Sequence, residues 1–262
     1  MREFIKKENE LPKKEFTWED YRSIVDGKPR YDGALLILRT LKTFKPIREL
    51  TKFVDWEKDP ESFSKLTNAQ QAAMREVKRL GDVKNAYFSD YLDSHPEDVE
   101  ILPGALELLT DLKRMGIRVA VASSSKNTPR VLQHVGIYDL FDVIISGHDI
   151  GNESDHLERL ISGKPNPDIF LEAVKRMGLE VDQCVGFEDA EAGVIAIKKA
   201  GLTCIGVDTE RGGKLTAADV VVMNLKGLTT EALTHIHDVQ NKYARRIVLE
   251  INKIRDVENQ LK

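Results

Sequence analysis

Residues 183–207, with the sequence QCVGFEDAEAGVIAIKKAGLTCIGV, decide the fold of this chain. Gln183–Glu188 and Leu202–Val207 are short, nearly continuous apolar runs, which are typical of parallel strands covered on both faces. Between them, Ala190–Ala200 has the pattern of a helix. The stretch therefore predicts strand, helix and strand, which is the repeating unit of a parallel α/β sheet.

The same alternation extends over residues 98–228. Further strands are predicted at Ile117–Ser123, Asp142–Ser146 and Asp219–Met223, and further helices at Pro103–Met115, Thr128–Val135 and Pro167–Met177. Because successive parallel strands are joined by right-handed crossovers, this order predicts an α/β fold with a doubly wound parallel sheet.

The two ends of the chain differ from this core. Helical patterns without a strand pattern occur in residues 1–97, at Trp18–Val25, Gly33–Lys42, Asn68–Leu80 and Val83–Leu92, and predict a helical cap domain. Residues 229–262 repeat apolar side chains at three- and four-residue steps and predict an amphipathic C-terminal helix. Two interpretations of this helix stay open: it packs on its own domain, or it forms a coiled-coil-like homodimer.

The composition excludes several classes of partner. A net charge of −4 gives no basic surface for nucleic acid. No apolar run approaches the roughly 20 residues of a membrane span, and the N-terminus lacks a signal peptide pattern. Cys184 and Cys204 lie in apolar runs, where reduced thiols are favoured over a disulfide. We therefore expect a cytoplasmic protein with no nucleic-acid or membrane partner.

Polar side chains gather where predicted strands end, and ligands bind at the carboxyl ends of strands in open α/β sheets. Ser123 closes one strand and starts a serine-rich loop before a helix, which suits an anion. Glu188 and Asp189 close another strand and are hard oxygen ligands suited to Mg²⁺. Each of these features also has a structural explanation, such as helix capping.

A lysine in a proline-containing loop adds a cation. Lys164 lies between Gly163 and Pro165, and the prolines of this loop fix its backbone, so that a fixed ammonium offsets negative charge on a transferring phosphoryl group. The alternative is a solvated lysine in a loop.

Three segments in this order resemble motifs II, III and IV of the haloacid dehalogenase-like (HAD) phosphotransferases: VASSSKN at 121–127, GKPNPD at 163–168 and VGFEDAEAG at 185–193. The resemblance implies that Ser123 hydrogen-bonds the phosphoryl group and that Lys164 neutralises it. It also implies a Mg²⁺ site at Glu188 and Asp189.

Two segments of the cap resemble the β-phosphoglucomutase branch of that superfamily: VDGKPRYDG at 25–33 and VKN at 83–85. The resemblance implies these substrate-binding residues: Arg30, Lys84, Asn85, Ser124, Lys126 and Asn127. Surface charge is the alternative explanation for Arg30 and Lys84.

Motif I of the superfamily, an apolar strand ending in Asp-x-Asp-Gly, has no counterpart, because no Asp-x-Asp tripeptide occurs in the sequence. By the resemblance, that motif supplies the nucleophile and the central strand of the sheet. Asp26-Gly27 follows Ser-Ile-Val but falls in the cap and lacks the second aspartate, so it is rejected as motif I. A sequence that starts too late, a true pseudoenzyme and a strand supplied by another chain all remain open explanations.

The resemblance implies a Mg²⁺-dependent phosphohydrolase or phosphomutase of β-phosphoglucomutase type that acts on a sugar phosphate, and it implies inactivity of this sequence without the nucleophile. Two alternatives remain. One is a catalytically dead module that binds a phosphorylated metabolite, and the other is an interaction subunit that works through the C-terminal helix.

Overall fold

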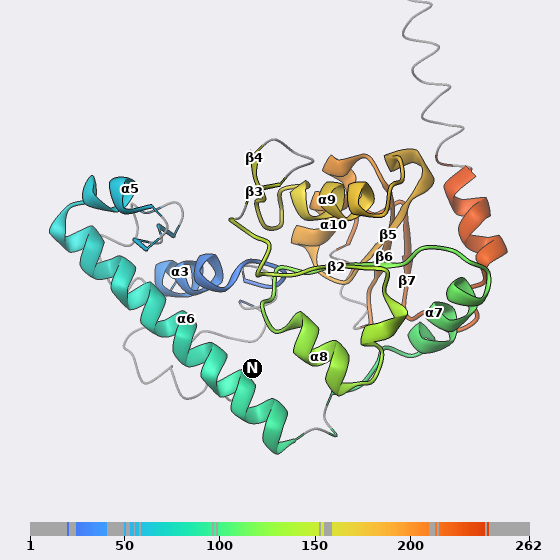
Figure 1. The fold of residues 1–262 in the computed structure, drawn as a ribbon, viewed down its shortest axis with the longest axis horizontal. Helices are drawn as coiled ribbons and strands as arrows, with labels where there is room; N and C mark the ends of the chain where they lie inside the picture. Colours follow the sequence, from blue (N-terminus) through green and yellow to red (C-terminus); the bar gives the residue numbers. More distant parts are fainter. Residues whose placement is uncertain are drawn as a thin grey trace, which may run out of the picture.

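The computed structural model of the chain describes residues 20, 25–40, 50, 53–54, 56–57, 59–95, 97, 99–151, 153–154, 159–209, 213, 215–238 and 240. A helical part precedes an α/β part (Figure 1). Most of the helix predicted at residues 18–25 and the predicted C-terminal helix beyond residue 240 lie outside the described residues.

Among the described residues, the helical part contains α3 (Arg30–Thr40), α5 (Pro60–Ser64) and α6 (Asn68–Ser94). A capping box between Thr67 and Gln70 starts α6 by satisfying backbone N–H groups that lack helical partners. The helices share a core of their own, formed by Val25, Ala34, Leu35, Ile37, Leu38, Leu50, Val54, Ala73, Met74, Val77 and Leu80.

The helical patterns at 68–80 and 83–92 both correspond to helix, and the structure joins them in one continuous helix, α6, of 27 residues. Gly81 lies inside it, where α3 crosses. A Cβ atom on Gly81 would lie 2.6 Å from Tyr31 Cδ1. The glycine therefore permits close packing of two helices and does not end either of them.

Every predicted strand is present in the α/β part: β1 (Ala120–Ala122), β2 (Val143–Ile145), β5 (Val185–Glu188), β6 (Thr203–Val207) and β7 (Val220–Val222). All pair in parallel, β1 with β2 and β5 with β6 and then β7. A short antiparallel pair, β3 (Glu153–Ser154) and β4 (Arg159–Leu160), was not predicted. Within the described ranges, no strand hydrogen-bonds β1 to β5.

The helices of the α/β part lie on both sides of the strands, as α7 (Ala105–Arg114), α8 (Thr128–His134), α9 (Asp168–Arg176) and α10 (Glu191–Ala200), with 3₁₀ turns η2 (Tyr138–Leu140) and η3 (Val181–Gln183). Cys204 of β6 packs with α9 and α10, while its neighbour Ile205 packs with Leu108 of α7. The continuous apolar runs of the sequence thus correspond to strands buried on both faces.

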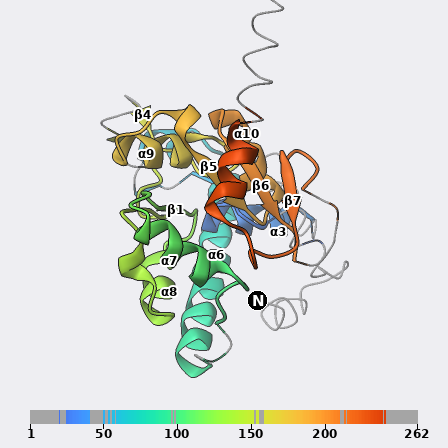
Figure 2. The ribbon, with the colours of Figure 1, turned by 90° about the vertical axis from the view of Figure 1, so that its right-hand side faces the viewer.

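Residues 230–238 are helical and begin the predicted C-terminal helix. Leu233 and Ile236 pack against Val207 and Leu225, so this segment covers the α/β part (Figure 2). None of the helices among the described residues combines the length and the apolarity that crossing a membrane requires.

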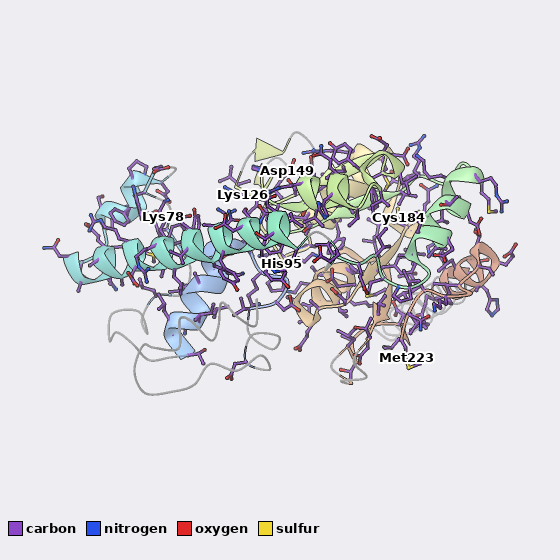
Figure 3. The ribbon with its side chains drawn as sticks, turned by 90° about the horizontal axis from the view of Figure 1, so that it is seen from below. Lys78, His95, Lys126, Asp149, Cys184 and Met223 are labelled. Atoms are coloured by element: carbon purple, nitrogen blue, oxygen red, sulfur yellow. The ribbon has the colours of Figure 1, made fainter. Side chains whose placement is uncertain are left out.

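The two parts of the molecule touch at several points. The last turn of α6, just before His95, reaches the α/β part, whereas Lys78 lies farther out on the same helix (Figure 3). Asp93 of this last turn forms an ion pair with Arg130 of α8. This ion pair places the C-terminal end of α6 beside α8.

Candidate active site

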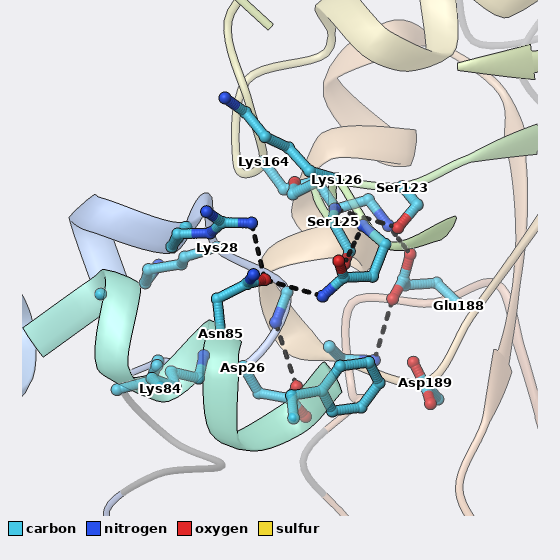
Figure 4. Close-up of a pocket in the computed structure, with 18 residues that line it drawn as sticks. Asp26, Lys28, Lys84, Asn85, Ser123, Ser125, Lys126, Lys164, Glu188 and Asp189 are labelled. Carbon is cyan, nitrogen blue, oxygen red and sulfur yellow. Dashed lines mark hydrogen bonds and ion pairs between the residues drawn. The ribbon is translucent and has the colours of Figure 1, made fainter. Parts of the chain in front are cut away.

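A cavity of about 320 Å³ lies between the helical part and the loops that follow β1 and β5 (Figure 4). The structure brings every predicted site residue to its wall: Arg30, Lys84, Asn85, Ser123, Ser124, Lys126, Asn127, Lys164, Glu188 and Asp189. Segments distant in sequence meet there, as expected where parallel strands end at one edge of a sheet.

A buried ion pair forms one wall. Lys164 Nζ lies 2.6 Å from Glu188 Oε2, and both side chains are 8% exposed. Lys164 also lies over the ring of Phe170, with 5.1 Å between its Nζ and the ring centroid. Burial raises the pKa of Glu188 above its ordinary value, Asp189 raises it further, and the ammonium of Lys164 opposes both effects. The ammonium of Lys164 therefore favours the charged form of a carboxylate that burial disfavours.

Each member of this pair is held by its loop. The fully buried Asp168 accepts a hydrogen bond from Ser162 N at 2.9 Å, which fixes the loop ahead of Lys164. The Glu188 side chain bends back so that its Oε1 accepts from Ala190 N at 3.2 Å. It covers Gly193, where any Cβ atom would collide with the Glu188 carboxyl group. The position of the Glu188 side chain therefore requires a glycine at position 193.

The adjacent carboxylates of Glu188 and Asp189 fit a Mg²⁺ ion in the chemistry of their oxygen donors. No group of three or more His, Cys, Asp or Glu side chains suited to a metal occurs among the residues that the structure describes. Two carboxylates agree with the usual protein contribution to a Mg²⁺ site, in which water and a phosphate complete the octahedron.

The serine-rich loop after β1 is ordered by its own hydroxyls. Ser125 N donates to Ser123 Oγ, and Asn127 N donates to Ser125 Oγ, both at 3.2 Å. Ser124 Oγ is buried and makes no hydrogen bond to any described residue. The loop thus presents hydroxyl and amide groups beside Lys164 and Glu188.

One of the links between the helical part and the α/β part is the side-chain oxygen of Asn85. Asn85 Oδ1 accepts from Arg30 Nη2 at 2.6 Å and from Asn127 Nδ2 at 2.9 Å, and Figure 4 shows both bonds as dashed lines. Next to it, the pKa of Lys84 is lowered to about 8, mainly by burial and also by the positive charge of Arg30, while the carboxylate of Asp26 opposes this shift. These residues form the cationic side of the cavity.

Sequence reasoning missed four polar or aromatic wall residues: Asp26, Lys28, Phe88 and Ser125. Asp26 and Lys28 lie in residues 25–33, the segment whose resemblance to the family indicated Arg30, so the same segment could have indicated these two residues as well. Asp26 was considered only as a nucleophile and rejected for that role.

Comparisons with known proteins agree with the fold and the motifs. A model of the haloacid dehalogenase-like hydrolase family matches residues 2–201. The β-phosphoglucomutase of Bacillus subtilis is 38% identical over 151 residues, which are 58% of this chain and 59% of the enzyme. The validoxylamine A 7′-phosphate phosphatase of Streptomyces hygroscopicus is 34% identical over 136 residues, or 51% of this chain and 58% of the phosphatase. The chain thus spans less than two thirds of either relative.

A solved structure covers more of the chain. The crystal structure of β-phosphoglucomutase from Clostridium difficile superposes with a TM-score of 0.64 at 27% identity, covering 93% of this chain and 88% of that enzyme. The α/β core and the helical part are therefore both similar to a β-phosphoglucomutase structure.

Proposed function

Because this chain belongs to the haloacid dehalogenase-like hydrolase family, we propose that its cavity is a Mg²⁺-dependent phosphotransfer site for a phosphorylated sugar. The observation that carries the proposal is the meeting of Ser123, Lys164 and the Glu188–Asp189 pair at one cavity. Relatives named as a phosphomutase and as a phosphatase support this reaction class.

The residues around β1 and β5 would hold the phosphoryl group. Ser123 and the neighbouring loop amides donate hydrogen bonds to its oxygens, and the ammonium of Lys164 offsets their charge. Mg²⁺ bound at Glu188 and Asp189 would add positive charge on the phosphoryl oxygens. Since Lys164 is already fixed by its ion pair, little reorganisation is needed when phosphate arrives.

The residues of the helical part would hold the far end of the substrate. Arg30 and Lys84 face the cavity with Lys28, and Lys126 and Asn127 approach from the other side. This concentration of cations favours a substrate that carries a second anionic group away from the reacting phosphate. Such a ligand would suit either a phosphomutase or a phosphohydrolase.

The reaction itself requires a nucleophile that the motifs of this sequence do not supply, since no Asp-x-Asp occurs in it. We therefore propose that these residues alone bind phosphate esters without covalent turnover. Binding without turnover is also what the second candidate, a module that senses or carries a phosphorylated metabolite, would show.

The division of the chain into a cap (1–97), a core (98–228) and a C-terminal helix (229–262) belongs to the same proposal, as does a cytoplasmic location. A homodimer through the C-terminal helix is proposed as well. Gel filtration with and without residues 239–262 tests it, and an unchanged apparent mass would contradict it.

Isothermal titration of the chain with inorganic phosphate, with and without Mg²⁺, tests the site. We expect binding that Mg²⁺ strengthens and that Lys164→Met abolishes. The exposed Lys65, which pairs with Glu61 on α5, provides the control Lys65→Met. Equal phosphate binding by both variants would remove Lys164 from the site, and release of phosphate from glucose 6-phosphate would contradict binding without turnover.

A further inference from the structure

Asp26 lines the cavity from the helical part, and the roles proposed above leave it without a function. It lies in a turn over residues 25–28, in which Lys28 N donates to Val25 O at 3.1 Å. Gly27 has φ of +73°, which favours glycine, and its N–H donates to Asp26 Oδ1 at 3.1 Å. The turn therefore fixes the carboxylate at the wall of the cavity.

The turn lies directly on the loop that follows β5. A Cβ atom on Gly27 would lie 3.3 Å from Ala190 Cβ and 3.5 Å from Ala192 Cβ. Pro29, at the end of the turn, packs onto Gly163 beside Lys164. Asp26 is thus held close to the phosphoryl-binding loops although it belongs to the helical part.

The charge next to Asp26 indicates what it can bind. The carboxylate interacts electrostatically with Lys84 and raises the pKa of that ammonium, and Figure 4 shows both residues on the same side of the cavity. A phosphate at this place would be repelled by the carboxylate. A hydroxyl group, in contrast, can donate to a carboxylate and accept from an ammonium.

We propose that Asp26 is a specificity-determining residue that accepts a hydrogen bond from a hydroxyl of the substrate's carbon skeleton. The cavity then selects polyhydroxylated phosphate esters over esters of similar shape without hydroxyls. Arg30 still reaches the cavity beside Asn85 and Asn127, where its guanidinium can hold a second anionic group, although it also lies 3.9 Å from Asp82 Oδ1. The inference rests on the proposed function, since it requires phosphate esters to bind in this cavity.

A pair of matched ligands tests the role of Asp26. Glucose 6-phosphate and cyclohexylmethyl phosphate carry the same phosphomonoester on six-membered rings with and without hydroxyls. Titration calorimetry of the full chain gives the ratio of their affinities. This ratio is the readout because Asp26→Ala also removes a negative charge and strengthens the binding of every anion.

We expect the wild-type chain to favour glucose 6-phosphate and Asp26→Ala to lower the ratio by about tenfold or more, the usual effect of one hydrogen bond to a charged group. Asp26→Asn keeps the shape and one acceptor and should give an intermediate ratio. Asp90→Asn, an exposed acid of α6 outside the cavity, is the control and should leave the ratio unchanged.

The outcomes separate this inference from the function on which it rests. An unchanged ratio in Asp26→Ala, or a wild-type chain without preference, would overturn the role of Asp26 while phosphate binding stands. A wild-type chain that melts cooperatively but binds no inorganic phosphate would overturn both proposals. If Asp26→Ala does not fold, the near-isosteric Asp26→Asn decides: a lowered ratio supports the role and an unchanged ratio overturns it.

Discussion

Glu188 Oε2 accepts a hydrogen bond of 2.6 Å from Lys164 Nζ in a place where each side chain is 8% exposed. Removing one member of such a pair leaves the other charge buried and uncompensated. We expect Lys164→Met to lower the free energy of unfolding by about 3–5 kcal/mol. Denaturant titration measures this loss. The control Lys65→Met, which removes one member of the exposed Lys65–Glu61 pair, should change the free energy of unfolding by less than about 0.5 kcal/mol. Equal losses in both variants would contradict the burial argument.

Binding of Mg²⁺ should weaken with acidification earlier than at an ordinary glutamate. The pKa of Glu188 is raised by burial and by Asp189, so a proton competes with the metal at a higher pH than at an ordinary glutamate. Titration calorimetry with Mg²⁺ over a series of decreasing pH should show a steady fall in affinity. Glu188→Gln should bind Mg²⁺ weakly at every pH of the series, and a pH-independent affinity in the wild-type chain would argue against Glu188 as a ligand.

The affinity for phosphate esters should decrease as the pH rises through about 8, the lowered pKa of Lys84. The buried ammonium attracts phosphate only while it is protonated. The free energy of unfolding should change in the opposite direction. In the unfolded chain Lys84 has its ordinary pKa of 10.5, so unfolding takes up a proton between about pH 8 and pH 10.5. The free energy of unfolding therefore increases with pH in this range. The arginine of Lys84→Arg stays charged over this range, so the variant should not lose affinity above about pH 8. Titration calorimetry at a series of pH values measures the affinity. A wild-type affinity that stays constant would exclude Lys84 from phosphate binding.

Asn85→Ala should weaken the binding of sugar phosphates by about tenfold while leaving the chain folded. The variant removes one oxygen that accepts from both Arg30 and Asn127, and each bond to a charged or amide donor is worth about 1 kcal/mol or more. Titration calorimetry with glucose 6-phosphate measures the change. Asn68→Ala at the exposed start of α6 is the matched control, and similar affinities for the two variants would show that the link does not organise the cavity.

Much of the fold could be predicted because its strands carry a strong local signal. Every residue of β6, from Thr203 to Val207, is buried, so the apolar run in the sequence reports directly on burial at both faces. The loops after β1 and β5 were found for a related reason: polar side chains that directly follow such runs must lie at the sheet edge.

The features that escaped prediction depend on contacts between distant segments. Gly81 lies between the two helical patterns of the sequence, and its role is to let Tyr31 approach, which lies 50 residues earlier in the chain. The β3–β4 pair involves only two residues on each strand, too few for a periodic pattern. Asp26 was overlooked as a wall residue because its place at the cavity depends on the turn lying against Ala190.

The contact of Gly27 with Ala190 and Ala192 also has an evolutionary consequence. At 3.3–3.5 Å from the two methyl groups, even one added carbon at position 27 would crowd the start of α10. The three positions should therefore covary in size among relatives of this chain, and a library randomised at all of them should retain ligand binding almost only in combinations of glycine, alanine and serine. At this contact between the helical part and the α/β part, we therefore expect selection to act on side-chain size rather than on charge.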